Sequence, residues 1–407
     1  MPILSKFKST VLLLFLVFSA CKGQQKDADA TSAVTTNAPA PIIVAANRTE
    51  AYLPLLQGKK VGVVANPTSV VFHKSGCTHL VDSLLSSMIE VQKVFAPEHG
   101  FRGTADAGEH VKDGVDTQTN LPIISLYGKN RKPAPEQLSD VDVIVFDIQD
   151  VGVRFYTYIA TLQLVMEACA ENNKPIIVLD RPNPNGHYVD GPTMLEEHTS
   201  YLGMNPIPLV YGMTMGEYAQ MLNGEGWLEN GNKADLTVIE LENYTHESEY
   251  HLPIRPSPNL PNDISINLYP SLGLFEGTNV NAGRGTEFQF QRYGASFMDS
   301  TKYDYSYVPE PNFGSKYPKE EGKTCYGRDL SHVPRMNEVS MEWIIDAYKN
   351  TLDKSKFFLT DGFTKHAGTP LLQHQIENGM TNDEIKATWQ ADLECFKKIR
   401  EKYLIYD

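Results

Sequence analysis

The chain has 407 residues, of which 36 are basic and 50 acidic, and its formal net charge is −14. A surface this acidic argues against nucleic acid and anionic lipid as partners, because both are themselves negatively charged. Apart from Cys21, the cysteines are Cys77, Cys169, Cys325 and Cys395, and their wide separations match no short metal-ligand pair.

The first 21 residues have the pattern of a bacterial lipoprotein signal peptide. Lys6 and Lys8 precede an apolar run at 11–18 that is too short to span a bilayer, and two small residues then lead to Cys21. This arrangement resembles a lipobox, whose cysteine thiol receives a diacylglyceryl group. The alternative is an ordinary secretory signal followed by a chance cysteine. We expect an exported protein, lipid-anchored in the cell envelope, and Lys22 favours the outer membrane, facing the periplasm or the surface.

Residues 22–46 are rich in Ala, Thr, Asp and Pro and have no apolar period, which is typical of a flexible tether. The remaining stretch of about 360 residues is long enough for two domains. From about residue 253 the sequence becomes dense in Pro, Asn and Gly. We therefore expect an N-terminal catalytic domain at 47–261 and a C-terminal domain at 262–407.

Short apolar runs alternate with helical patterns in the first of these domains. The runs lie at 60–66, 91–97, 122–128, 141–148 and 174–180, and helical patterns lie at 79–89, 155–172 and 215–228. The last helical pattern starts with Thr214-Met-Gly-Glu217, which is a capping box. Such an alternation favours an α/β fold with a parallel, Rossmann-like sheet that is covered on both faces. For the C-terminal domain we expect a smaller α+β fold with helices at 341–351 and 381–403.

Nucleotide and serine-hydrolase motifs are missing from these strand ends. No G-x-G-x-x-G follows a predicted strand, no G-x-x-x-x-G-K-[ST] occurs, and the nucleophile elbow G-x-S-x-G is also absent. We therefore expect a Rossmann-like sheet without a dinucleotide fingerprint and without a bound cofactor.

Polar side chains stand where the predicted strands end. They are Asn66, the pair Glu98 and His99, then Asp147, Gln149 and Asp150, and finally Asp180 and Arg181. Ligands of open α/β sheets bind beyond the carboxyl ends of the strands, so these residues predict a site at that edge.

The chain also carries, in this order, "GVVANPTSV", "FAPEHGFRG", "DAGE", "LYG", "VDVIVFDIQDVGVRFYTY", "LDRPNPNGHYVDGP", "PSPNLPN" and "EGTNVNAGRGTEFQF". Together these motifs resemble the NamZ-type exo-β-N-acetylmuramidase family, formerly a domain of unknown function. The resemblance runs from about residue 47 to the C-terminus. It implies a glycosidase that releases terminal N-acetylmuramic acid from the non-reducing end of peptidoglycan fragments. It also implies an active-site cleft between a Rossmann-like domain and a smaller C-terminal domain, with Glu98 as the catalytic glutamate.

Glycosidic cleavage ordinarily needs a carboxyl that protonates the leaving oxygen and a second group that acts at the anomeric carbon. Glu98 follows an apolar run and a proline, so partial desolvation would favour its acid form. His99 either orients Glu98 or bonds a backbone carbonyl. The candidates for the second group are Asp147, Asp150, Glu109 and Glu287. The N-acetyl group of the substrate is the alternative.

Muramic acid carries a lactyl carboxylate, for which a guanidinium is the best partner. Arg102, Arg154 and Arg284 are candidates for this contact, and a structural ion pair is the alternative for each. Further candidates for substrate binding are Asn66, Asn259, Glu109 and Glu287, and Asn183 and Asn279 could also bind sugar hydroxyls. Each of the asparagines could equally shape a turn.

Three other readings of the same residues compete with a glycosidase that uses carboxyl groups alone. A metal at Glu98, His99, Asp147 and Asp150 is disfavoured, because adjacent residues at a strand end point to opposite faces and no H-E-x-x-H occurs. A lipoprotein that binds cell-wall sugars of the MurNAc-GlcNAc type without cleaving them is the alternative function. Phe155, Tyr156 and Tyr158 would then supply an aromatic platform. An esterase or deacetylase is disfavoured by the missing motifs, and the sequence leaves the oligomeric state open.

Overall fold

The computed structural model describes residues 40–102 and 113–407. The predicted signal peptide, Cys21, most of the tether, and Glu109 lie outside the described residues. The last residues of the predicted tether, Val44, Ala45 and Ala46, are buried in the core, so the prediction of a flexible segment up to residue 46 is wrong at this end. Within the described ranges, no helix has both the length and the apolar character needed to cross a membrane.

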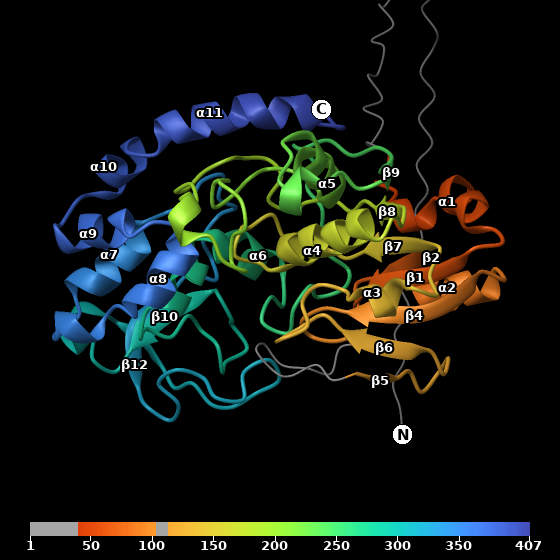
Figure 1. The fold of residues 1–407 in the computed structure, drawn as a ribbon. Coiled ribbons are helices and arrows are strands. Elements are labelled where there is room, and N and C mark those ends of the chain that lie inside the picture. The colour runs from red at the N-terminus through yellow and green to blue at the C-terminus, as the bar shows by residue number, and fades with distance from the viewer. Residues whose placement is uncertain (1–39, 103–112) are drawn as a thin grey trace, which may run out of the picture. The chain divides into compact units, whose positions relative to one another are not determined.

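A seven-stranded sheet organises the first half of the fold (Figure 1). In chain order its strands are β1 (Lys60–Ala65), β4 (Glu90–Ala96), β5 (Gly114–Val115), β6 (Pro122–Ser125), β7 (Val143–Asp147), β8 (Ile176–Leu179) and β9 (Leu236–Ile239). Their spatial order is β5-β6-β4-β1-β7-β8-β9, and every neighbouring pair is parallel except β5 with β6. The predicted parallel sheet is confirmed, and each of the five apolar runs overlaps one of its strands.

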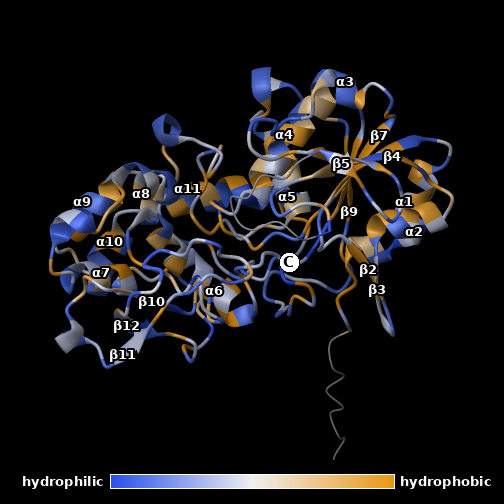
Figure 2. Ribbon diagram, turned by 90° about the horizontal axis from the view of Figure 1, so that it is seen from below, coloured by the Kyte–Doolittle hydropathy of each residue, from blue (hydrophilic) through white to orange (hydrophobic). Residues whose placement is uncertain are grey.

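The two faces of this sheet support two separate hydrophobic clusters. In β7, Ile144 and Phe146 belong to one cluster and Val143 and Val145 to the other, because successive side chains of a strand point to opposite faces. Helices α4 (Tyr158–Glu171) and α5 (Met215–Gly224) pack in the first cluster, and α1 (Thr49–Leu56) and α2 (Leu80–Ser86) in the second. Figure 2 shows the strands of the large sheet as mostly hydrophobic, as a sheet covered on both faces requires.

Two short elements also belong to this half. The strands β2 (Val70–His73) and β3 (Gly76–His79) form a hairpin, and α3 (Pro135–Leu138) precedes β7. The predicted capping box at the start of α5 is present, because the Thr214 side chain accepts a hydrogen bond from the backbone N–H of Glu217 and the Glu217 side chain accepts one from that of Thr214.

The C-terminal part is a smaller α+β arrangement, as expected. It begins with α6 (Asp263–Leu272) and the 3₁₀ segment η4 (Gly273–Gly277). A three-stranded antiparallel sheet follows, in the order β10 (Arg292–Ala295), β12 (Cys325–Asp329), β11 (Tyr305–Tyr307). The helices are α7 (Glu342–Lys349), α8 (Thr360–Ala367), α9 (Leu371–Glu377), α10 (Asn382–Ala387) and α11 (Gln390–Arg400).

The helix predicted at 381–403 is interrupted, and its two parts are α10 and α11. Two contacts stabilise the interruption. The Trp389 indole donates to Asp190, at 3.0 Å, and the Thr388 hydroxyl accepts a hydrogen bond from the side-chain amide of Gln375, at 3.1 Å. These tertiary hydrogen bonds override the preference of the segment for one continuous helix. Trp389, Leu393 and Phe396 of this segment are buried in the core.

The η4 segment and α8 touch backbone to backbone at Gly277. Leu359 N–H donates to the Gly277 carbonyl at 2.9 Å, and a Cβ at position 277 would lie 2.3 Å from the Cα of Phe363. Only glycine therefore permits this approach, which fixes the neighbouring Glu276 relative to α8.

We predict that Gly277→Ala lowers the free energy of unfolding by about 1–3 kcal/mol, because the added methyl forces the two segments apart. The matched control is Gly362→Ala, which lies on α8 in the same contact and whose Cβ would come no closer than 3.7 Å to any atom. Alanine favours a helix over glycine by about 1 kcal/mol, so the control should be neutral or stabilising. Thermal melting measures both, and an unchanged melting temperature for Gly277→Ala would contradict the close contact.

Candidate active site

A pocket of about 170 Å³ lies beyond the end of β4. The first half of the chain contributes Glu98, His99, Phe155, Tyr156 and Thr157 to its wall. The second half contributes Asn259, Tyr269, Glu276, Arg284 and His366, among others. Both halves belong to one compact unit, Pro41–Asp407. The predicted edge of the sheet therefore carries a pocket, and the C-terminal part supplies much of its lining.

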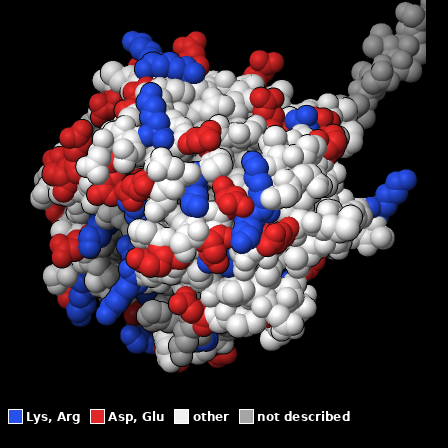
Figure 3. Space-filling view, turned by 45° about the vertical axis from the view of Figure 1, so that its right-hand side comes forward, with Lys and Arg blue, Asp and Glu red and all other residues white. Residues whose placement is uncertain are grey.

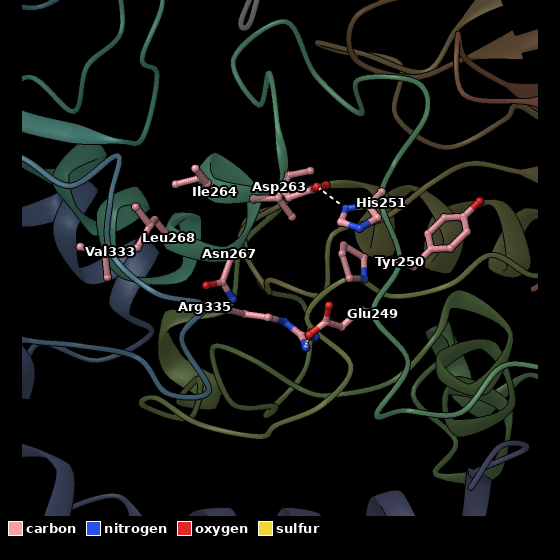
Figure 4. A pocket seen from close by; sticks show the side chains of 11 residues that line it. Glu249, Tyr250, His251, Asp263, Ile264, Asn267, Leu268, Val333 and Arg335 are labelled. Atoms are coloured by element: carbon pink, nitrogen blue, oxygen red, sulfur yellow. Dashed lines mark hydrogen bonds and ion pairs between the residues drawn. The ribbon is translucent and has the colours of Figure 1, made fainter. Parts of the chain in front are cut away.

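Figure 4 shows a second, larger pocket of about 250 Å³ around Leu268 and Val333. Its wall is mainly apolar, and the charged residues at its rim are paired. His251 contacts Asp263 at 2.5 Å and Arg335 contacts Glu249 at 3.2 Å. None of the predicted site residues lines it, so its size does not make it the better candidate for chemistry.

The local chain geometry places Glu98 in the smaller pocket. β4 ends at Ala96, and a turn closed by the bond from Gly100 N–H to the Pro97 carbonyl, at 3.0 Å, reverses the chain. His99 has a φ of 71° and Gly100 a φ of 79°, so both are left-handed. A non-glycine residue in this region is uncommon, and such strain tends to occur at functional sites.

Thr157 fixes one oxygen of the Glu98 carboxyl. Its hydroxyl donates to Oε2 at 3.0 Å, and the Tyr158 hydroxyl donates to the Glu98 backbone carbonyl at 3.4 Å. Thr157 and Tyr158 stand at the start of α4, so the helix positions the glutamate through both its side chain and its main chain. His99 is buried beside it and lines the same pocket.

The structure brings a second carboxylate, Glu276, into this pocket, and the sequence reasoning missed it. Its Oε2 accepts a bond from Arg284 Nη1 at 2.9 Å. Burial alone would raise the pKa of Glu276, but the charges of Arg284 and Lys319 hold that pKa below its ordinary value. The sequence offered one signal for Glu276, because this residue is the first of the motif "EGTNVNAGRGTEFQF", which also contains Arg284. The motif follows a helix, however, and not a strand of the large sheet.

Tyr269 lines the same pocket as the two glutamates. Burial comes first among the causes that raise the pKa of its phenol, and the negative charges of Glu276 and Glu98 raise it further. The Tyr269 ring packs edge-on against Phe155 and Phe290, at centroid distances of 5.1 and 4.7 Å, which fixes it between the two halves.

The two aspartates predicted as catalytic candidates do not line the pocket. Asp147 is fully buried and forms a two-pronged ion pair with Arg181, at 2.5 and 2.9 Å. Asp150 is also buried; it accepts bonds from the Tyr211 hydroxyl at 2.5 Å and the Gly152 N–H at 2.7 Å. Burial raises the pKa of Asp150 to about 6. These contacts favour structural roles for both.

Of the three arginine candidates, the structure brings only Arg284 to the pocket. Arg102 donates to Asp82 and Asp116, both within 3.2 Å, so the ion-pair alternative describes it. Arg154 is fully buried and donates to four backbone carbonyls. Arg284 donates to Glu276, and its Nε has no hydrogen-bond partner among the described residues.

The asparagine candidates make hydrogen bonds within the protein. Asn66 accepts bonds from the Thr68 N–H and hydroxyl, Asn183 donates to Met213, and Asn279 donates to Lys356. Asn259 alone lines the pocket, and it donates to the Gly314 carbonyl. Glu287 is exposed and lies outside the pocket wall. Across the described ranges, no group of three His, Cys, Asp or Glu side chains is placed to hold a metal ion.

The fold is a mostly parallel α/β sheet, and one pocket holds a strand-end glutamate and a second carboxylate. Such a protein belongs to a class that is suited to acid–base chemistry on a small polar ligand. The chain belongs to the exo-β-N-acetylmuramidase NamZ family: residues 61–264 match its N-terminal part and residues 267–406 its C-terminal part. The family resemblance is confirmed.

Individual relatives agree with this assignment. The chain is 38% identical over 377 residues to "Peptidoglycan beta-N-acetylmuramidase NamZ" of Bacillus subtilis (strain 168), covering 87% of this chain and 89% of that protein. It is also similar to two solved DUF1343 family proteins from Bacteroides fragilis NCTC 9343. BF0379 has a TM-score of 0.83 at 43% identity, and BF0371 a TM-score of 0.75 at 29% identity. Each comparison covers 90% of this chain and 99% of the other.

The pKa of Asp150 leads to a prediction about stability. Because the folded state raises this pKa from its ordinary value near 4 to about 6, it holds the proton more tightly than the unfolded state. The resulting contribution is present below about pH 4 and is lost as the pH rises to about 6. At about 1.4 kcal/mol per pKa unit, the loss amounts to at most about 3 kcal/mol.

We predict that Asp150→Asn shows a shallower fall in the free energy of unfolding between pH 4 and pH 7 than the wild type. Urea denaturation at several pH values gives this slope, whatever the absolute stability of the variant. Asp235→Asn, at an exposed position, is the control and should keep the wild-type slope. Parallel slopes for Asp150→Asn and the wild type would show that Asp150 does not titrate in this range.

Proposed function

We propose that this protein is an exo-acting glycoside hydrolase that releases terminal N-acetylmuramic acid from the non-reducing end of peptidoglycan fragments. The observation that carries the proposal is the position of Glu98: the glutamate of the E-H-G motif stands at a strand end inside a pocket that holds a second carboxylate. The name of the Bacillus subtilis relative supports the substrate class.

The size of the pocket supports exo action. Ligand pockets typically measure about 300–1,000 Å³, whereas this one measures about 170 Å³. It suits a single terminal sugar better than an internal stretch of glycan. The two family matches meet between residues 264 and 267, which supports the boundary proposed near residue 262 and a pocket shared by both domains.

In this function Glu98 is the general acid. The hydroxyl of Thr157 donates to Oε2, which orients the carboxyl group that transfers its proton to the glycosidic oxygen. A carboxyl with one oxygen fixed by a hydrogen bond needs little reorganisation before it transfers a proton. The turn at His99 and Gly100 takes the chain away from the pocket directly after the glutamate.

The alternative, a sugar-binding lipoprotein without hydrolysis, receives less support. Tyr156 and Tyr158 are buried, pack against each other at 4.8 Å, and the Tyr156 hydroxyl is bonded to the Pro256 carbonyl. Phe155 is 3% exposed. Phe155 and Tyr156 line the pocket, and all three rings belong to the core rather than to an open stacking platform.

We predict that the wild-type protein hydrolyses MurNAc-GlcNAc and that Glu98→Gln lowers kcat on this disaccharide by about 10² to 10⁴, since the amide cannot supply the proton. On a dinitrophenyl β-N-acetylmuramide, whose leaving group needs no proton, part of the rate should return. The melting temperature should stay close to that of the wild type. Binding of MurNAc without any turnover by the wild type would favour the lipoprotein binder, and an active Glu98→Gln on both substrates would remove Glu98 from the chemistry.

We also propose that the protein is exported and anchored to the outer membrane by a lipid on Cys21. The short apolar run and the small residues before Cys21 support this proposal. Cys21→Ser should move the protein from the membrane fraction to the soluble fraction when the bacterial envelope is separated. An unchanged distribution would contradict the lipid anchor, and Cys77→Ser, at an exposed cysteine, is the matched control.

A further inference from the structure

The pocket has two acidic residues among the described residues that line it, Glu98 and Glu276. The other candidates for the second group are excluded from the pocket wall or lie outside the described residues. Asp147 and Asp150 are buried in structural contacts, and Glu287 is exposed elsewhere. A glycosidase ordinarily works with a pair of carboxyl groups around the scissile bond, so Glu276 is the residue to examine.

The main chain of Glu276 is held from several directions. The Lys319 ammonium donates to the carbonyls of Phe275, Glu276 and Thr278, at 3.0, 2.9 and 2.6 Å. Position 277 touches the backbone of α8, as described above. The short segment 275–278 thus wraps around one cation, and the carboxylate that it presents to the pocket is pre-positioned.

The side chain of Glu276 is also fixed, and it keeps its charge. Arg284 Nη1 bonds to Oε2, and the Arg284 Nη2 group bonds to the Gly314 carbonyl at 3.3 Å, which orients the guanidinium. The Glu276 side chain is 24% exposed, so it still faces the open pocket. A simple ion pair would explain the contact with Arg284, but Glu276 also lines the pocket that holds Glu98.

We propose that Glu276 is the second catalytic carboxylate, whose negative charge faces the anomeric carbon and stabilises the positive charge that develops there during hydrolysis. The inference rests on the proposed function. Arg284 and Lys319 are positioning residues in this arrangement, because they act on the sugar through Glu276. Two carboxyls in different surroundings, one able to donate a proton and one held as an anion, are what acid-catalysed glycoside cleavage requires.

In the proposed hydrolysis, Glu98 donates its proton to the glycosidic oxygen, and the bond between that oxygen and C1 breaks with its electron pair on the departing alcohol. The positive charge is then shared between C1 and the ring oxygen, next to the Glu276 anion. A water oxygen forms the new bond to C1, and its released proton returns to the Glu98 carboxylate. Glu276 stays ionised throughout and is not consumed.

The test compares two leaving groups in Glu276→Gln and Glu98→Gln. Loss of a pre-positioned electrostatic group typically costs about 10² to 10³ in kcat, so Glu276→Gln should lose activity by this order on both MurNAc-GlcNAc and the dinitrophenyl substrate. Glu98→Gln should regain part of its rate on the dinitrophenyl substrate alone. Wild-type kcat of Glu276→Gln on the dinitrophenyl substrate would overturn the inference, because that substrate still passes through the positively charged state.

Two further variants separate chemistry from folding. Glu394→Gln removes an exposed acid on α11 and should keep wild-type kcat on both substrates. If Glu276→Gln does not fold, Glu276→Asp keeps the anion beside Arg284 but withdraws it from the sugar by one methylene. That variant should melt near the wild type and still lose kcat on both substrates, and full activity would overturn the inference. A wild-type protein that is inactive on both substrates would instead defeat the proposed function itself.

Discussion

The pocket depends on one buried cation, Arg154. Its guanidinium donates to the carbonyls of Pro192 and Ile207, at 2.7 and 2.8 Å, and to those of His366 and Ala367, at 3.0 and 2.8 Å. The last two residues end α8, where main-chain carbonyls have no helical partner and the helix dipole favours a cation. Burial lowers the pKa of Arg154 to about 9, so the charge persists at neutral pH.

Gly368, which follows α8, permits the close approach of Arg154. It has a φ of 82°, and a Cβ there would come within 2.8 Å of the guanidinium. The arginine thus connects the loop that carries Thr157 to the helix that carries His366, and both of these residues line the pocket.

A buried charge, such as that of Arg154, must be paired or hydrogen-bonded. This requirement explains why most polar residues at the strand ends stabilise the site instead of performing its chemistry. Asp147 meets this requirement through Arg181, and Asp180 through the hydroxyls of Thr214 and Tyr406. Asp180 also accepts a bond from the Gly216 N–H at 2.8 Å, in the first turn of α5, where an acidic group is favoured. The carboxyl ends of the strands are therefore crowded with ionisable groups, but Glu98 is the one that remains at the pocket with a carboxyl oxygen bonded by a neutral hydroxyl.

Sequence patterns predicted the elements whose signal is local. The β-branched runs identified β1, β4, β6, β7 and β8, and the capping box identified the start of α5, because burial on both faces and capping leave their marks within a few residues. The edge strands β5 and β9 carry weaker patterns and were not predicted.

Glu98 was found from its motif and its position at a strand end. Glu276 was missed because its function depends on three segments, around residues 98, 276 and 366, that only the folded chain brings together. The interruption between α10 and α11 has the same origin, since the bond from Trp389 to Asp190 spans 199 residues.

Electrostatics in the pocket must be local, because the protein and its proposed substrate carry the same sign of charge. On the face shown in Figure 3, acidic and basic side chains are interspersed, so this view offers no broad basic field to attract an anionic sugar. The screening length at physiological salt is about 8 Å, and distant charges therefore contribute little. Within the pocket region, Arg284 and Lys319 stand beside Glu276, and a glutamate flanked by two cations can remain ionised next to a second carboxyl without a large repulsive cost. One small cluster can thus keep a carboxylate charged inside the pocket, which an acidic protein could not achieve through its overall charge.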